Sequence, residues 1–227
     1  MVTGDQAAAE QSPTGERSFS ALFSDKKKFE LLSDEAAYRL ARFFNYFGLI
    51  VPMLVVLAAM GYQVFGDELP CSHCNMQRLG FFMLALGPAL NLRFGFRPSH
   101  YGISLAGAFF LGTVALDMMV RISNQNLDGW GPKALGLHMY GWSLVIALIG
   151  GVALVVMFLW ERQFDLSRTA EFRPSRKASG LLVAAFAVAL VIIGLDLVSV
   201  IFECGIGLCP DAPPTDYPFL SWIVSLL

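Results

Sequence analysis

Residues 43–65, FFNYFGLIVPMLVVLAAMGYQVF, decide the fold class. This segment carries no charged residue, and a helix of this length, rising ~1.5 Å per residue, crosses the ~30 Å hydrocarbon layer of a bilayer. The whole chain is similar in character, since 56% of its 227 residues are hydrophobic and only 15% are charged. That composition is unusual for a soluble domain and indicates a protein that lies in a membrane.

Four more apolar segments follow, at 74–92, 101–120, 138–160 and 180–202. The sequence therefore predicts an all-α integral membrane protein, with a four-helix transmembrane bundle core and an additional fifth transmembrane helix. The second segment is the weakest, because only 79–90 is continuously apolar and Arg78 lies inside its end. Pro52 and Pro88 lie within the first two segments and predict kinks rather than breaks.

The lysines and arginines indicate the orientation of these helices. Cytoplasmic flanks and short loops carry an excess of both residues, and thirteen of the sixteen fall in three segments that five spans place on one side. We therefore expect a cytoplasmic N-terminus and an outward-facing C-terminus. The thirteen residues are Arg17, Lys26, Lys27, Lys28, Arg39, Arg42, Arg93, Arg97, Arg162, Arg168, Arg173, Arg176 and Lys177.

This topology divides the chain into four parts. Residues 1–42 are expected to form a cytoplasmic arm, partly disordered because of its small, polar and charged composition. Residues 43–160 hold the four-helix core, 161–179 form a cytoplasmic loop, and 180–227 hold the fifth helix and an outer segment. The formal net charge of −2 excludes a nucleic-acid binder, which would carry a basic stripe.

All four cysteines, Cys71, Cys74, Cys204 and Cys209, fall on the outer side of this topology. Disulfides persist outside the cytoplasm, where the environment is oxidising. A random distribution would rarely place every cysteine in two short outer segments. The pattern therefore favours a redox role for both pairs.

The first pair lies in the sequence PCSHC at 70–74. Proline suits the first turn of a helix, so both thiols are expected near a helix N-terminus, where the dipole favours a thiolate. Spacings of three and four put Cys71, Cys74 and Arg78 on one helix face. A quinone entering from the bilayer would meet a thiolate and a guanidinium that can hydrogen-bond its carbonyl oxygen.

The second pair lies in the sequence CGIGLC at 204–209. Two glycines permit the tight turn that brings the two α-carbons within the ~4.4–6.8 Å that a disulfide requires. Such a loop is expected to be accessible to an incoming thiolate, as thiol exchange demands.

Other polar residues of the outer half have structural interpretations. His73 is expected at the surface, where it modestly favours the neighbouring thiolates. Asp117 and Asp196 fall inside predicted spans, where a carboxylate is a functional candidate. Both lie near the outer end of their helix, and Asp117 can pair with Arg121 four residues later, so the structural interpretation is favoured for both.

Two motifs resemble the bacterial disulfide-bond-formation protein B (DsbB) family, including its DsbI-type members. The first is Cys71-x-x-Cys74-x-x-x-Arg78, which opens the second predicted helix, and the second is LGLHMYGW at 135–142, which opens the fourth. The resemblance covers roughly 43–160. It implies a multi-pass bacterial inner-membrane enzyme that reoxidises a periplasmic thioredoxin-fold thiol oxidase (DsbA-like) and passes the electrons to ubiquinone or menaquinone.

The resemblance also implies roles for individual residues. Cys71 and Cys74 would be the quinone-coupled pair, with Cys74 the thiolate next to the ring, and Arg78 and Met139 would contact the quinone. Cys204 and Cys209 would exchange disulfides with the partner oxidase. The family's second pair usually lies between helices 3 and 4, whereas here 122–137 contains no cysteine and the pair follows the fifth helix.

Alternative interpretations stay open on the sequence alone. The two pairs are also compatible with static disulfides that brace a transporter or an assembly protein, and with a zinc site of four thiolates. A reductase of the vitamin K epoxide reductase kind would run similar chemistry in the reverse direction. A c-type haem is excluded at the first pair, because residue 75 is Asn where CxxCH requires His.

Overall fold

A computed structural model of the chain describes residues 33–66, 69–125, 133–169 and 180–205, together with Gly129, Cys209 and Tyr217. Most of the predicted N-terminal arm, residues 170–179 of the predicted cytoplasmic loop, and the C-terminal segment apart from Cys209 and Tyr217 lie outside these residues.

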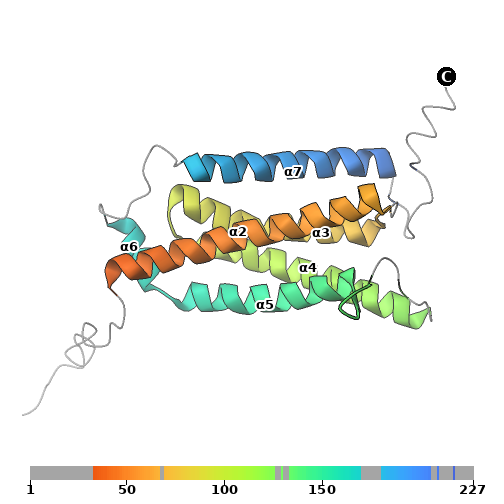
Figure 1. Cartoon of the computed structure of the whole chain (residues 1–227). Helices are drawn as coiled ribbons and strands as arrows, with labels where there is room; N and C mark the ends of the chain where they lie inside the picture. The colour runs from red at the N-terminus through yellow and green to blue at the C-terminus, as the bar shows by residue number, and fades with distance from the viewer. Residues whose placement is uncertain are drawn as a thin grey trace, which may run out of the picture.

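Six helices and one short hairpin make up the described fold (Figure 1). Five of the helices coincide with the five predicted apolar segments, which confirms the all-α prediction. The first begins earlier than its apolar segment, because the side chain of Ser33 caps its N-terminus by accepting from the Ala36 N–H at 3.3 Å. The elements are α2 (Asp34–Phe65), α3 (Ser72–Phe94), α4 (Pro98–Asn124), β1 (Lys133–Ala134), β2 (Leu137–His138), α5 (Met139–Leu159), α6 (Arg162–Arg168) and α7 (Gly180–Cys204).

Four of the described helices, α2, α4, α5 and α7, are long and apolar enough to cross a membrane. The predicted second span, α3, is long enough but not apolar enough to be counted with them, so a fifth span is not shown. Its polar side chains explain the difference, because Gln77, Arg78 and Asn91 are buried against neighbouring helices. Because these side chains are buried, α3 exposes little polar surface to lipid.

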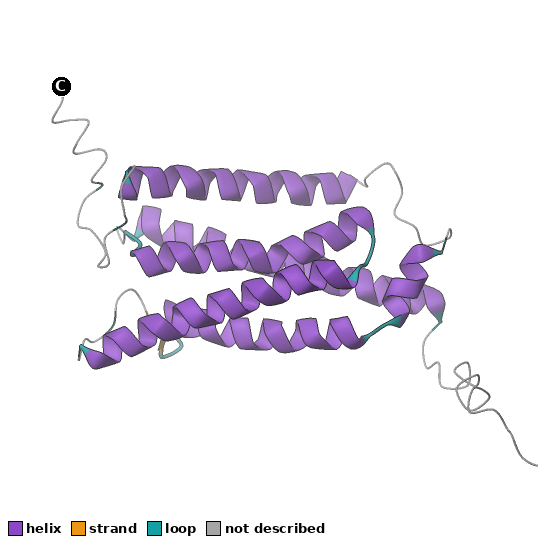
Figure 2. Ribbon diagram, turned by 180° about the vertical axis from the view of Figure 1, so that it is seen from behind, coloured by secondary structure: helices purple, strands orange, loops and turns teal. Residues whose placement is uncertain are grey.

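The long helices lie side by side (Figures 1 and 2). Helix α3 packs against α2 and α4, α4 packs against α5, and α7 packs against α2 and α3. Glycines allow the closest approach, since a Cβ at Gly107 of α4 would lie 2.7 Å from the backbone nitrogen of Leu84 in α3. Both helices that hold the predicted kink residues, Pro52 and Pro88, continue past them.

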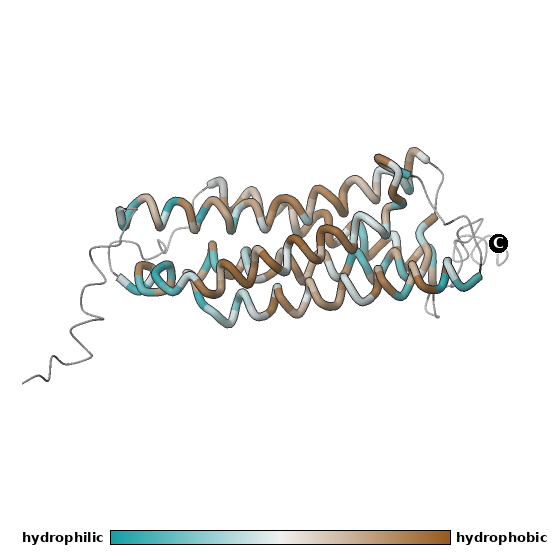
Figure 3. The backbone as a smooth tube through the Cα atoms, turned by 90° about the horizontal axis from the view of Figure 1, so that it is seen from below, coloured by the Kyte–Doolittle hydropathy of each residue, from teal (hydrophilic) through white to brown (hydrophobic). Residues whose placement is uncertain are grey.

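The long helices are apolar along most of their length, as the brown stretches of Figure 3 show, and many of their large apolar side chains are exposed. On α5 and α7, Ile149, Val152 and Leu190 are each 66% exposed. A soluble protein would rarely leave such large side chains uncovered along whole helices. The pattern is that of helices surrounded by hydrocarbon.

A buried polar network closes the end of the bundle where α6 lies. Asn45 donates to the hydroxyl of Tyr101 at 2.7 Å, and that hydroxyl donates to Gln163 at 2.8 Å. Asn91 donates to the side-chain oxygen of Asn45 at 2.9 Å. These bonds tie α2, α3, α4 and α6 together without leaving their shared polar atoms unpaired.

The opposite end of the bundle holds the cysteines (Figure 1). The C-terminal end of α2, the N-terminal ends of α3 and α5, the hairpin and the C-terminal end of α7 all meet there. The sequence placed both cysteine pairs on one side, and the structure agrees that they share one end of the bundle.

Candidate active site

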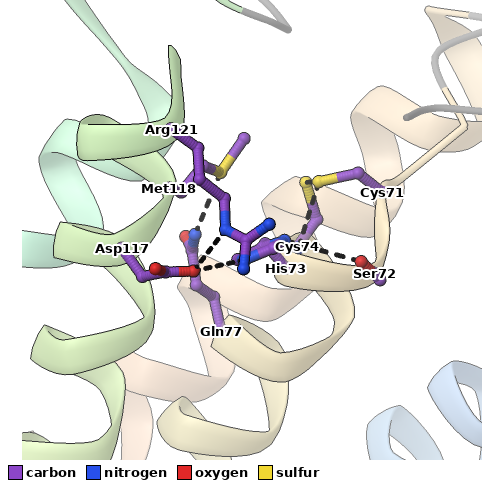
Figure 4. Close-up of polar contacts among 8 residues, drawn as sticks. All are labelled: Cys71, Ser72, His73, Cys74, Gln77, Asp117, Met118 and Arg121. Atoms are coloured by element: carbon purple, nitrogen blue, oxygen red, sulfur yellow. Dashed lines mark hydrogen bonds and ion pairs between the residues drawn. The ribbon is translucent and has the colours of Figure 1, made fainter. Parts of the chain in front are cut away.

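The first cysteine pair is built into the start of α3. Cys71 is the N-cap residue, and its sulfur accepts a hydrogen bond from the Cys74 backbone N–H at 3.3 Å. The two side-chain sulfurs lie 2.7 Å apart as free thiols (Figure 4). Cys71 is only 1% exposed. Both thiols therefore lie at a helix N-terminus, as the sequence predicted.

The contacts of Cys71 stabilise its thiolate. The thiol of Cys74 donates to the Cys71 sulfur and lowers the pKa of Cys71 to about 7, against the opposing effect of burial. The Cys74 backbone N–H, the positive charge of His73 and the His73 backbone lower it further. The resemblance assigns the quinone-facing thiolate to Cys74, whereas these hydrogen bonds favour the first loss of a proton from Cys71.

An apolar cluster surrounds this pair. Cys71 belongs to it together with Met118 and Ile122 of α4 and Tyr140 of α5. Gln77, one turn further along α3, donates to the sulfur of Met118 at 3.5 Å. Met139, predicted as a quinone contact, precedes Tyr140 and is partly buried, but Tyr140 is the α5 residue that packs in the cluster. No sequence motif singled out Met118 or Tyr140 as part of this cluster.

His73 lies in an ion-pair group and not at the open surface that we expected. Its Nε2 is 2.8 Å from Oδ2 of Asp117, and its side chain is only 13% exposed (Figure 4). Arg121 donates to the same carboxylate oxygen at 2.8 Å, which confirms the predicted pair on α4. The expected surface position of His73 was wrong because its partner lies on α4, and the sequence does not show which helices adjoin.

Arg78 follows Cys74 by one turn and is 5% exposed. Its Nη1 donates to Gln63 of α2 at 3.1 Å and to Asp196 of α7 at 2.9 Å. Among the described residues, its Nη2 and Nε have no partner. The predicted stack of the dithiol over this cation stays a prediction, because the partners of Arg78 lie on α2 and α7 whereas Cys71 packs against α4 and α5.

Helix α7 presents a polar stripe to α2 and α3. Asp196, Ser199 and Glu203 lie on one face at spacings of three and four. Gln63 donates to Ser199 at 2.6 Å, and Asn75 donates to Glu203 at 2.9 Å. From the sequence we considered Asp196 as a separate residue and did not single out Glu203, although a carboxyl group at the end of an apolar segment is itself a signal.

The second cysteine pair lies directly beyond this stripe. Cys204 ends α7 and forms a disulfide with Cys209 across an α-carbon distance of 4.5 Å, within the predicted range. Gly205 makes the turn with φ of 63°, a conformation that favours glycine. In the described part of the chain, the sulfurs of this pair make no hydrogen bond to Cys71 or Cys74. Asn75 and Glu203 connect the two segments instead.

The described residues contain no group of three or more His, Cys, Asp or Glu side chains placed to hold a metal ion. The chemistry available at this end of the bundle is that of thiols, a disulfide, a buried guanidinium and buried carboxyl groups. That set defines a class of protein, a helical membrane protein with one dithiol and one disulfide at the same end.

Comparison with known families narrows this class. Residues 41–121 match the family described as disulfide bond formation protein DsbB. The matched segment covers less than half of the chain, and over it the protein is similar to this family of disulfide-bond formation proteins. The match includes Cys71, Cys74 and Arg78 but ends before Met139, Cys204 and Cys209. No curated protein and no solved structure gives a significant match to the chain.

Proposed function

We propose that the protein is a thiol:quinone oxidoreductase of a bacterial inner membrane, with its N-terminus in the cytoplasm and its C-terminus in the periplasm. It reoxidises a periplasmic dithiol oxidase of the thioredoxin fold and passes the electrons to membrane ubiquinone or menaquinone. The DsbI-type assignment belongs to this proposal, because the second cysteine pair follows an additional helix.

One observation carries the proposal: the Cys71 and Cys74 thiols touch at the N-terminus of α3, one turn before the buried Arg78. The pair is a two-electron donor whose thiolate forms near neutral pH. A structural disulfide has no need of a buried cation beside it, since burying an unpaired or partly paired charge costs free energy.

Arg78 fits the quinone by the chemistry of its unused donors. The two hydrogen bonds that Arg78 makes to Gln63 and Asp196 both use Nη1, which leaves Nη2 and Nε available to a ligand. A carbonyl oxygen of a quinone is a suitable acceptor for them. When bound, the quinone supplies a two-electron acceptor, and the cluster of Cys71, Met118, Ile122 and Tyr140 supplies apolar surroundings.

The electron path uses both cysteine pairs. A partner dithiol attacks the Cys204–Cys209 disulfide, and a mixed disulfide forms and resolves, so the partner is oxidised and this pair is reduced. The reduced pair then attacks a disulfide between Cys71 and Cys74. Re-forming that disulfide releases two electrons and two protons, which convert a quinone to a hydroquinone.

Quinone reduction by the purified protein tests the proposal. Reduced thioredoxin-fold oxidases and dithiothreitol serve as separate electron donors, and the absorbance of ubiquinone or menaquinone analogues reports turnover. Ser72→Ala, which alters a residue between the cysteines and neither thiol, is the matched control for Cys71→Ala and Cys74→Ala. Turnover that survives loss of either thiol contradicts the proposal. Electron flow from hydroquinone to the partner favours the vitamin K epoxide reductase direction.

A further inference from the structure

Glu203 is a buried carboxyl group that the electron path does not use. Its side chain is 1% exposed at the end of α7, next in sequence to Cys204. One carboxyl oxygen, Oε2, accepts from Asn75 Nδ2 at 2.9 Å. Asn75 itself follows Cys74. The hydrogen bond between these side chains therefore joins the two cysteine segments.

Both partners of this hydrogen bond keep an unsatisfied acceptor. Glu203 Oε1 and Asn75 Oδ1 are buried and have no hydrogen-bond partner among the described residues. Buried polar atoms are nearly always paired, so two unpaired acceptors on two bonded side chains require an explanation. The described residues supply no further donor to these two oxygens.

A single proton on Glu203 supplies that donor. A carboxylic acid and a primary amide can exchange two hydrogen bonds, because each presents one donor and one acceptor side by side. With Oε1 protonated, Glu203 can donate to Asn75 Oδ1 while Asn75 Nδ2 still donates to Oε2. One proton then removes both unsatisfied acceptors and the cost of a buried negative charge.

We propose that Glu203 is held as a carboxylic acid by Asn75 and that it carries the proton exchanged when electrons pass from the Cys204–Cys209 pair to the Cys71–Cys74 pair. This inference rests on the proposed function for its place in the reaction. The protonated state of Glu203 itself rests only on the geometry.

The proton balances the thiol exchange. A thiolate of the second pair attacks the first-pair disulfide, an inter-pair disulfide forms, and the leaving sulfur takes the proton of Glu203. The remaining thiol of the second pair then gives its proton to the Glu203 carboxylate and attacks the inter-pair disulfide. At the end the second pair is a disulfide again, and the first pair is reduced to one thiol and one thiolate.

That product matches the first pair as the structure shows it. Cys71 and Cys74 lie with sulfurs 2.7 Å apart, so the thiol of one can donate to the thiolate of the other. The charged groups around Glu203 are Arg78 on α3 and Asp196 on α7, which already bond to each other. Neither forms a hydrogen bond with Glu203, so Asn75 is the described residue that holds the Glu203 carboxyl group.

Infrared spectroscopy of the full-length protein tests the protonated state. We expect a protonated-carboxyl C=O band that disappears in Glu203→Gln. This substitution is mild, because a glutamine amide can repeat both hydrogen bonds to Asn75. Glu161→Gln, at the other end of the bundle, is the matched control and should keep the band. Failure of Glu203→Gln to remove such a band overturns the proposal.

Thiol transfer tests the proton-carrying role. Oxidised protein without quinone is mixed with a reduced thioredoxin-fold oxidase, which delivers electrons through Cys204 and Cys209, and quenched alkylation follows the reduction of Cys71 and Cys74. Glu203→Gln should slow this transfer by roughly 100-fold or more, the usual effect of losing a general acid or base. The effect should vanish when Cys204 and Cys209 are both replaced by serine and dithiothreitol is the donor, since dithiothreitol reaches the first pair directly.

The outcomes separate this proposal from the proposed function. An unchanged transfer rate in Glu203→Gln, or an equal loss in the double-serine background, overturns the proton-carrying role. Neither assay contains quinone. A wild-type protein that fails to reduce quinone therefore contradicts the proposed function while the infrared band and the thiol-transfer result still stand on their own.

Discussion

Arg78 Nη1 lies 2.9 Å from Asp196 Oδ1, with side chains only 6% and 9% exposed. The ion pair joins α3, which carries the dithiol within the family-matched segment, to α7, which lies outside that segment and ends in the second cysteine pair. The additional helix is thus fixed to the dithiol helix by a buried charge pair. We infer that α7 helps to position the site.

Removing one partner of this ion pair should destabilise the protein. Asp196→Ala leaves the Arg78 guanidinium buried without its counter-charge, which typically costs about 3–5 kcal/mol. Glu35→Gln breaks an exposed pair with Arg39 and should cost at most about 1 kcal/mol. Thermal unfolding in detergent measures both. Equal losses for the two variants would show that the Asp196 pair contributes no more than a surface contact.

The α3–α4 contact should tolerate one glycine substitution on α4 and not the other. At Gly107 a Cβ would lie 2.7 Å from the Leu84 nitrogen, whereas at Gly102 nothing lies within 4 Å. Gly107→Ala should therefore destabilise by about 1–3 kcal/mol through overpacking, and Gly102→Ala should be neutral or stabilise by up to about 1 kcal/mol. The same unfolding assay applies. A neutral Gly107→Ala contradicts the described helix packing.

The reactivity of the reduced first pair should change near neutral pH. With the pKa of Cys71 lowered to about 7, its alkylation rate should rise with pH and level off above about 7. Because Cys71 ionises more easily in the folded than in the unfolded protein, its thiolate also stabilises the fold. This contribution to the free energy of unfolding should grow as pH rises above about 7, and it should be lost as pH falls through about 7. Cys74→Ala removes the main donor to Cys71, so the midpoint should move up towards the usual cysteine value. An unmoved midpoint excludes the Cys74 hydrogen bond as the cause.

Arg78→Lys should weaken quinone binding while preserving the ion pair with Asp196. A lysine ammonium can replace the contact at Nη1 but does not present the remaining guanidinium donors. Loss of a charge-assisted hydrogen bond of about 1.5–3 kcal/mol raises the KM for quinone by about 10- to 100-fold. Arg121→Lys, on an exposed arginine of α4, should leave this KM unchanged. An unchanged KM in Arg78→Lys removes Arg78 from the quinone site.

The sequence predicted the helices well because apolar length is a local property. The segment 180–202 predicted α7 nearly to the residue, since the helix runs from Gly180 to Cys204. The start of α2 was predicted too late. Residues 34–42 are helical but polar, and hydropathy does not detect a polar helical segment.

Contacts between helices were not predictable in the same way. His73 with Asp117 and Arg78 with Asp196 depend on which helices adjoin and in what rotation, and a single sequence does not specify either. The face shared by Asp196, Ser199 and Glu203 was readable from its helical spacing. Only the structure shows that this face meets Gln63, Asn75 and Arg78.

The relay between the two cysteine pairs is the central claim, and quinone reduction by cysteine variants tests it most directly. With a reduced thioredoxin-fold partner as donor, Cys204→Ser and Cys209→Ser should lose quinone reduction, whereas dithiothreitol should still drive it through Cys71 and Cys74. Cys74→Ser should fail with both donors and still trap a mixed disulfide with the partner. Full partner-driven activity in Cys204→Ser and Cys209→Ser would contradict the relay and leave the second pair outside the electron path.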